Sequence, residues 1–155
     1  MKEFDYYIFI DYSENLLGYI IIERARIKDL LPKIFRFRHY RDAGDRKLYL
    51  KNVKQTFKRE NLLSYFIKHK IREIRQNMEI FLDVGEFIKN HSNCLIFASI
   101  DNKQYNNFQN FVKIVDGDNI KIIKESELKV GTIEYQISLI LDNLLNIERL
   151  KHEDK

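Results

Sequence analysis

Two aspartates in this chain stand directly after short runs of apolar residues. Asp11 follows the run at residues 6 to 10, and Asp101 follows the run at residues 94 to 100. Runs of this length and composition are typical of buried β-strands. In a parallel sheet the carboxyl ends of neighbouring strands meet at one edge, where ligands bind. If these two strands are neighbours, we expect their carboxylates to converge; the alternative is that each aspartate begins a turn or caps a helix.

Converging carboxylates have a characteristic chemistry. Mg²⁺ and Mn²⁺ take oxygen ligands, and proteins hold them with one or a few carboxylates together with substrate phosphates. A pair of such ions orients and activates a water molecule and stabilises the leaving oxygen during phosphodiester hydrolysis. Asp11 and Asp101 are therefore candidate Mg²⁺ or Mn²⁺ ligands of a phosphodiesterase.

Charge is distributed unevenly along the chain. The 27 Lys and Arg residues exceed the 23 Asp and Glu residues by only four. Residues 24 to 75, however, contain seventeen basic and five acidic residues, an excess of twelve positive charges that leaves an excess of eight negative charges elsewhere. A segregated basic surface attracts polyanions, although lysine-rich helices that are merely solvated would give the same pattern.

Within this basic segment, residues 34 to 41 read IFRFRHYR and alternate in polarity, which predicts a third strand with one basic face. Arginines and an aromatic ring on one surface are typical of proteins that bind nucleic-acid backbones. His39, near Asp42 and Asp45, is a candidate proton shuttle. A solvated strand and loop is the alternative. The candidate nucleic-acid contacts are Arg36, Arg38, Tyr40, Arg41, Arg46 and Lys47.

The elements that must position these residues follow from hydrophobic periodicity and turn signals. The order that we expect is three strands, two helices, a strand, a helix, a strand and a final helix. The strands are predicted at residues 6 to 11, 16 to 23, 34 to 41, 94 to 101 and 120 to 123. The helices are predicted from about residue 48 to 74, at 80 to 88, at 105 to 112 and from 132 to about 150.

This order, with an aspartate after the first and fourth strands and an acidic residue in the final helix, resembles the ribonuclease H-like superfold of ribonucleases H, retroviral-type integrases, transposases and junction resolvases. IDYSE at residues 10 to 14 resembles the D-E-S opening of an uncharacterised prokaryotic family within it. SLILDNLLN at residues 138 to 146 resembles that family's closing helix. The resemblance implies an α/β fold: a five-stranded mixed sheet, its first three strands antiparallel and the fourth and fifth parallel to the first, flanked by helices.

Carried over residue by residue, the resemblance implies Asp11, Asp101 and Asp142 as catalytic metal ligands. A helical wheel places Asp142 nearly opposite the apolar stripe of the last helix, so a solvated aspartate is the alternative. Glu134 is the substitute third ligand, although a glutamate there also suits a helix N-terminus. The implied function is a metal-dependent nuclease; the alternative is a non-catalytic nucleic-acid-binding or protein-interaction module of the same fold.

The length of 155 residues predicts a single domain over residues 1 to 150, with a polar tail at 151 to 155. Cys94, the one cysteine, cannot form an internal disulfide. The first apolar run is interrupted at Asp11 and resembles neither a signal peptide nor a membrane span, so we expect a cytoplasmic protein that does not enter a membrane. The sequence distinguishes neither DNA from RNA nor a monomer from a homodimer.

Overall fold

The computed structural model describes residues 4–100, 102–116, 121–124 and 128–153. These residues form one sheet in the order β3-β2-β1-β4-β5. The strand pairs β1–β2 and β2–β3 are antiparallel, and β1–β4 and β4–β5 are parallel, so the expected mixed sheet is confirmed. The strands are β1 (Tyr6–Ser13), β2 (Leu16–Glu23), β3 (Lys68–Glu73), β4 (Cys94–Ser99) and β5 (Lys121–Lys124).

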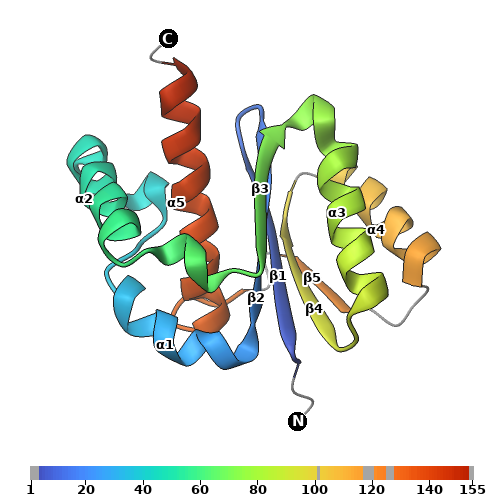
Figure 1. Ribbon diagram of the computed structural model, residues 1–155. Coiled ribbons are helices and arrows are strands. Elements are labelled where there is room, and N and C mark those ends of the chain that lie inside the picture. The colour runs from blue at the N-terminus through green and yellow to red at the C-terminus, as the bar shows by residue number, and fades with distance from the viewer. Residues whose placement is uncertain (1–3, 101, 117–120, 125–127, 154–155) are drawn as a thin grey trace.

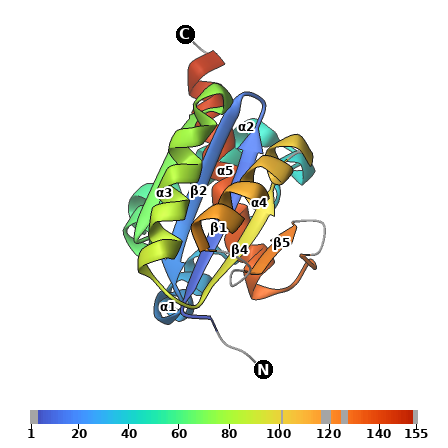
Figure 2. The same ribbon diagram turned by 90° about the vertical axis from the view of Figure 1, so that its right-hand side faces the viewer.

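Helices cover both faces of the sheet (Figure 1). Helices α1 (Arg24–Ile34), α2 (Arg46–Arg59) and α5 (Ile133–Glu153) lie on one face. Helices α3 (Asn77–Asn90) and α4 (Asn102–Asp116) lie on the other, as Figure 2 shows. Helix α5 packs against the sheet on one side and against α1 and α2 on the other, so two of its faces are buried. It also continues beyond Leu150 to Glu153, so the predicted tail begins as the last turn of this helix.

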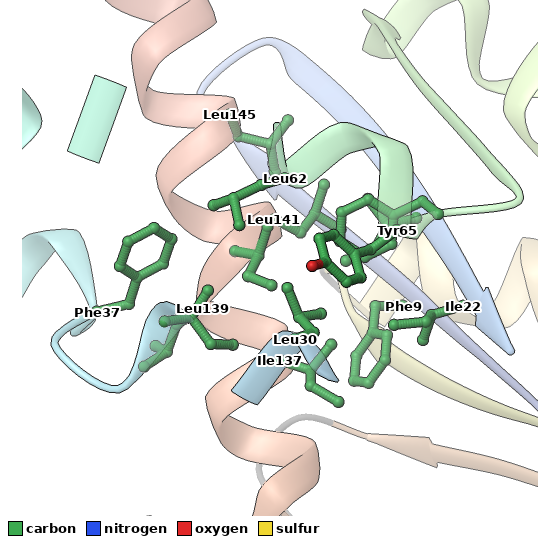
Figure 3. Close-up of a cluster of buried hydrophobic side chains, with 14 of the residues drawn as sticks. Phe9, Ile22, Leu30, Phe37, Leu62, Tyr65, Ile137, Leu139, Leu141 and Leu145 are labelled. Atoms are coloured by element: carbon green, nitrogen blue, oxygen red, sulfur yellow. The ribbon is translucent and has the colours of Figure 1, made fainter. Parts of the chain in front are cut away.

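Successive side chains of β1 point to opposite faces of the sheet, so the hydrophobic core is divided into two clusters. Phe9 points toward α5 and packs in a cluster with Leu141 and Leu145 (Figure 3). Ile8 and Ile10 belong to the cluster under α3 and α4. Full burial of side chains of this size stabilises the fold by about 1.5–3 kcal/mol each. Both clusters therefore hold β1, the strand that carries Asp11, in the centre of the sheet.

The strand predicted at residues 34 to 41 is wrong. Helix α1 ends at Ile34, and a single 3-10 turn, η1 (Tyr40–Asp42), follows an irregular segment. Phe35 and Phe37 would share one face of a strand, but Phe35 is 70% exposed and Phe37 only 7%. Phe37 packs beside Leu139 of α5 instead (Figure 3). Phe37 also lies 5.9 Å, between ring centroids, from Phe57 of α2, so this ring packs between two helices.

The long helix predicted from residue 48 to 74 is also wrong in its second half. Helix α2 ends at Arg59, and Asn61 takes a left-handed conformation with φ 49° that a continuing helix does not allow. The third strand is β3, which pairs with β2 at the edge of the sheet. Edge strands are commonly rich in charge, and the KHKIRE sequence of β3 therefore lacks the apolar alternation that marks a strand.

Candidate functional site

Asp11 lies where β1 and β4 run side by side to their carboxyl ends. It pairs with Ser99 in the parallel ladder, so the expected neighbourhood of the first and fourth strands is confirmed. Asp101, two residues after Ser99, lies outside the described residues. The Asp11 Oδ1 atom accepts a hydrogen bond of 2.7 Å from the backbone nitrogen of Tyr12.

Helix α5 crosses this end of β1 at close range. Ser138 and Leu141 line a small cavity together with Asp11 and Ser99. Gly18 is the register partner of Asp11 in β2. A Cβ atom at Gly18 would lie 3.2 Å from a methyl carbon of Leu145 and 3.1 Å from the carbonyl oxygen of Lys70. The glycine therefore lets α5 approach the sheet next to the candidate ligand.

Asp142 is buried, with 8% of its surface exposed, so the alternative of a solvated aspartate is wrong. Its Oδ2 atom accepts a hydrogen bond of 2.9 Å from the backbone nitrogen of Tyr40. Its Oδ1 atom lies 3.4 Å from Nε2 of His39. The helical wheel misled because η1 and the segment before it cover the side of α5 that a simple two-layer packing would leave in solvent.

The neighbours of Asp142 on α5 contact the carboxyl end of β1. Ser138, one turn earlier, lines the Asp11 cavity. Asn146, one turn later, accepts a hydrogen bond of 3.1 Å from the hydroxyl of Ser13 at the end of β1. Arg149 donates to the Ser13 hydroxyl at 3.2 Å and to Asn146 Oδ1 at 3.0 Å. The turn of α5 that carries Asp142 therefore lies over the same end of the strand as Asp11.

The other titratable residues named from the sequence have different surroundings. Glu134 lines a groove of about 480 Å³ with Tyr7 and Phe9 of β1, which come before Asp11 along the strand. Asp45 caps α2 by accepting a hydrogen bond of 3.1 Å from the backbone nitrogen of Leu48. The carboxylate beside His39 is consequently that of Asp142.

The basic candidates separate into two groups. Tyr40 adjoins Asp142 through its backbone, and its ring lies 5.4 Å from the Arg46 guanidinium carbon and 5.9 Å from that of Arg149. Arg41 and Lys47 are exposed nearby in sequence. Arg36 and Arg38 line a separate pocket against α2. Sequence reasoning missed Arg149; the signal that could have found it is its spacing, three residues after Asn146, which itself follows Asp142 by four.

In the part of the chain that the structure describes, no three His, Cys, Asp or Glu side chains come together as a metal-ligating group. The same residues contain no helix of sufficient length and apolarity to cross a membrane.

No known protein family matches this sequence, and no curated protein does. Among solved structures, the chain is similar to the crystal structure of ribonuclease H2 from Pyrococcus horikoshii OT3, with a TM-score of 0.52 and 14% sequence identity. The similarity covers 95% of this chain and 76% of that chain. The resemblance of IDYSE to a D-E-S family stays a prediction. The strand order, the mixed pairing and this structural neighbour together show that the chain has a ribonuclease H-like fold.

Proposed function

We propose that this protein is a divalent-metal-dependent nuclease whose metal ligands are Asp11, Asp101 and Asp142. The observation that carries the proposal is the position of Asp11 near the carboxyl end of β1, two residues before the strand ends at Ser13 and beside the parallel strand that leads to Asp101. The buried carboxylate of Asp142 lies on the turn of α5 that covers the same end of the strand. In sheets of this class, this edge is where ligands bind.

The donor set fits Mg²⁺ or Mn²⁺. Asp11 and Asp142 offer carboxylate oxygens, which hard divalent cations prefer as ligands. Asp101 completes the proposed set of ligands, and Glu134 is the substitute for Asp142. When bound, the ion would activate a water molecule and stabilise the charge that develops on the phosphate.

The chain's own residues give this site rigidity and a means to hold a polyanion. The Tyr40 backbone nitrogen and His39 fix the Asp142 carboxylate, while Ser13, Asn146 and Arg149 tie the end of β1 to α5. The basic residues around η1 would contact the phosphates of the strand, and the ring of Tyr40 offers a stacking surface. The proposed contacts are Tyr40, Arg41, Arg46 and Lys47 beside Asp142, with Arg36 and Arg38 further along.

The decisive experiment compares wild type with Asp11→Asn in cleavage of labelled DNA, RNA and RNA–DNA hybrid, with Mn²⁺ and with a chelator. We expect Mn²⁺-dependent cleavage by wild type and a loss of at least about 100-fold in the variant, because removal of a ligand charge weakens the grip on the ion. Asp5→Asn removes the same charge at the opposite end of β1, where Asp5 is exposed, and should leave the rate unchanged. Equal cleavage by wild type and Asp11→Asn would refute the proposal.

A second candidate, a non-catalytic nucleic-acid-binding module, draws support from the hydrogen bond from Tyr40 and the 3.4 Å contact with His39, which together engage both oxygens of Asp142. Such a module would bind nucleic acid with a steep salt dependence, because its arginines and lysines displace counterions. It would show no metal-stimulated turnover in the experiment above.

A further inference from the structure

A second concave surface lies between α2 and the segment that follows α1. Its volume is about 410 Å³, within the range of about 300–1,000 Å³ that is typical of ligand pockets. Its lining includes three arginines and several hydrogen-bonding side chains: Arg36, Arg38, Arg59, Tyr49, Asn52 and Thr56. Only Arg36 and Arg38 of this set were recognised in the sequence.

The pocket is strongly positive, because no carboxylate is among its lining residues. The nearest acidic residue in sequence, Glu60, is shared between Arg59 at 3.5 Å and Lys33 at 3.5 Å. It therefore offsets only part of the charge of Arg59. Arginine presents a planar fork of N–H donors that matches the oxygens of a phosphate group.

The backbone that carries Arg38 is held in place before any ligand arrives. The Tyr49 hydroxyl accepts a hydrogen bond from the Arg38 backbone nitrogen and donates one to the Arg38 carbonyl oxygen, each at 2.8 Å. The amide nitrogen of Asn143 donates to the same carbonyl oxygen at 3.1 Å. Burial raises the pKa of Tyr49, so its hydroxyl keeps the proton that it donates. Preorganisation of this kind lowers the entropy cost of binding.

Two buried apolar side chains, Phe37 and Val53, also line the pocket. A terminal phosphate carries close to two negative charges at neutral pH, since its second pKa is about 6, whereas an internal phosphodiester carries one. Three arginines without a carboxylate among the lining residues therefore favour a phosphomonoester over an internal phosphodiester.

We propose that this pocket binds the terminal phosphate of a nucleic-acid strand through Arg36, Arg38 and Arg59. The proposal rests on the proposed function for its choice of nucleic acid; the phosphate chemistry itself is shared with a free mononucleotide. Arg38 and Tyr40 are two residues apart, so their Cα atoms are at most about 7 Å from each other. Since Tyr40 contacts Asp142, a strand held by its end here would reach the acidic site within a few nucleotides.

The test is a binding measurement in chelator, so that it does not depend on cleavage. One labelled oligonucleotide is prepared with a 5′-phosphate, with a 3′-phosphate and with neither, and its affinity is measured by fluorescence anisotropy. We expect one phosphorylated form to bind about tenfold more tightly than the unphosphorylated form, as hydrogen bonds between charged groups typically allow.

Substitutions in the pocket test which residues cause the preference for a phosphorylated oligonucleotide. Arg36→Gln and Arg59→Gln, both at exposed positions, should each reduce the preference by severalfold, and the double variant should abolish it. Lys54→Gln is the matched control: it removes one positive charge from α2, but Lys54 lines the groove that faces α5. It should lower the affinity for all three oligonucleotides alike. Circular dichroism confirms that each variant is folded.

The outcomes separate this proposal from the nuclease proposal. Equal affinity for the three oligonucleotides would overturn the terminal-phosphate assignment, whatever the cleavage results. Competition by a mononucleotide as effective as that by the phosphorylated oligonucleotide would assign the pocket to a free nucleotide and overturn the choice of a strand end. A preference for a phosphorylated end without metal-dependent cleavage would support the pocket and contradict only the nuclease.

Discussion

The two faces of the sheet bury different kinds of side chain. The cluster under α3 and α4 is apolar, with Phe81 and Phe108 packed 5.2 Å apart between ring centroids. Under α5, the core also contains Asp142, Asn143 and Asn146, which are the buried polar or charged side chains of the described part of the chain. Burial of polar groups costs free energy unless they are hydrogen-bonded. The free-energy cost of burying these polar groups therefore falls on the face of the sheet where we propose the function.

Four basic and acidic side chains at the edge of the α3 face form a paired network: Lys70, Arg72, Glu79 and Asp83. The fully buried Tyr19 donates a hydrogen bond of 2.8 Å to Asp83, and Lys70 lies 2.6 Å from the same carboxylate oxygen. Burial acts to raise the pKa of Asp83, but the hydrogen bonds from Lys70 and Tyr19 outweigh it and hold that pKa below its ordinary value. This network joins β2 and β3 to α3, so its role is structural.

The largest expected effect is on the apolar face. Phe108→Ala should lower the free energy of unfolding by about 3–5 kcal/mol, because it removes a fully buried ring and leaves a cavity. Urea unfolding measures this loss. At a temperature where the variant is folded, its affinity for nucleic acid should equal that of wild type. A matching loss of affinity would show that the two faces are not independent.

An intermediate effect on the free energy of unfolding is expected for Asp83, at the edge of the α3 face. Asp83→Asn should lower the free energy of unfolding by about 1.5–3 kcal/mol at pH 7, because the Tyr19 hydroxyl and Lys70 both lose a charged acceptor, and only Glu79, at 3.2 Å, remains as a charged partner of Lys70. The folded pKa of Asp83 is depressed, so its contribution is complete above the unfolded pKa of about 3.9 and is lost as the pH falls through the folded pKa. Urea titrations at several pH values should show the two proteins converging in acid. Asp29→Asn, at an exposed position of α1, is the control, and its free energy of unfolding should differ from that of wild type by the same small amount at every pH.

The smallest effect is expected inside the polar core. Asn143→Leu should change the free energy of unfolding by no more than about 1 kcal/mol. The Asn143 Oδ1 atom has no hydrogen-bond partner among the described residues, and leucine removes this buried orphan. Arg38 would keep its bond from Tyr49, but with one fewer restraint. A loss of several kcal/mol in urea unfolding would contradict this prediction and show that the amide is needed for folding.

The sequence predicted the parts of the fold that depend on burial. Apolar runs identified β1, β2, β4 and β5, and helical periodicity identified α5, because each of these packs against one or both clusters. It did not predict β3, because this edge strand carries charged side chains. It predicted a strand around Phe35 and Phe37 that is absent, because alternating aromatic residues are also typical of strands. Asp11 could be placed from its run alone. The contacts of Asp142 could not, because they depend on η1 folding over α5 from about a hundred residues away.

Gly18 shows how a position without a functional group can set the dimensions of a site. It faces Asp11 across the β1–β2 ladder and leaves room for Leu145 of the helix that carries Asp142. A Cβ atom there would lie 3.0 Å from Cγ1 of Ile71, 3.1 Å from the carbonyl oxygen of Lys70 and 3.2 Å from a methyl carbon of Leu145, so a larger residue would require these neighbours to shift. The absence of one methyl group at this position therefore permits the close packing of β2, β3 and α5 next to Asp11.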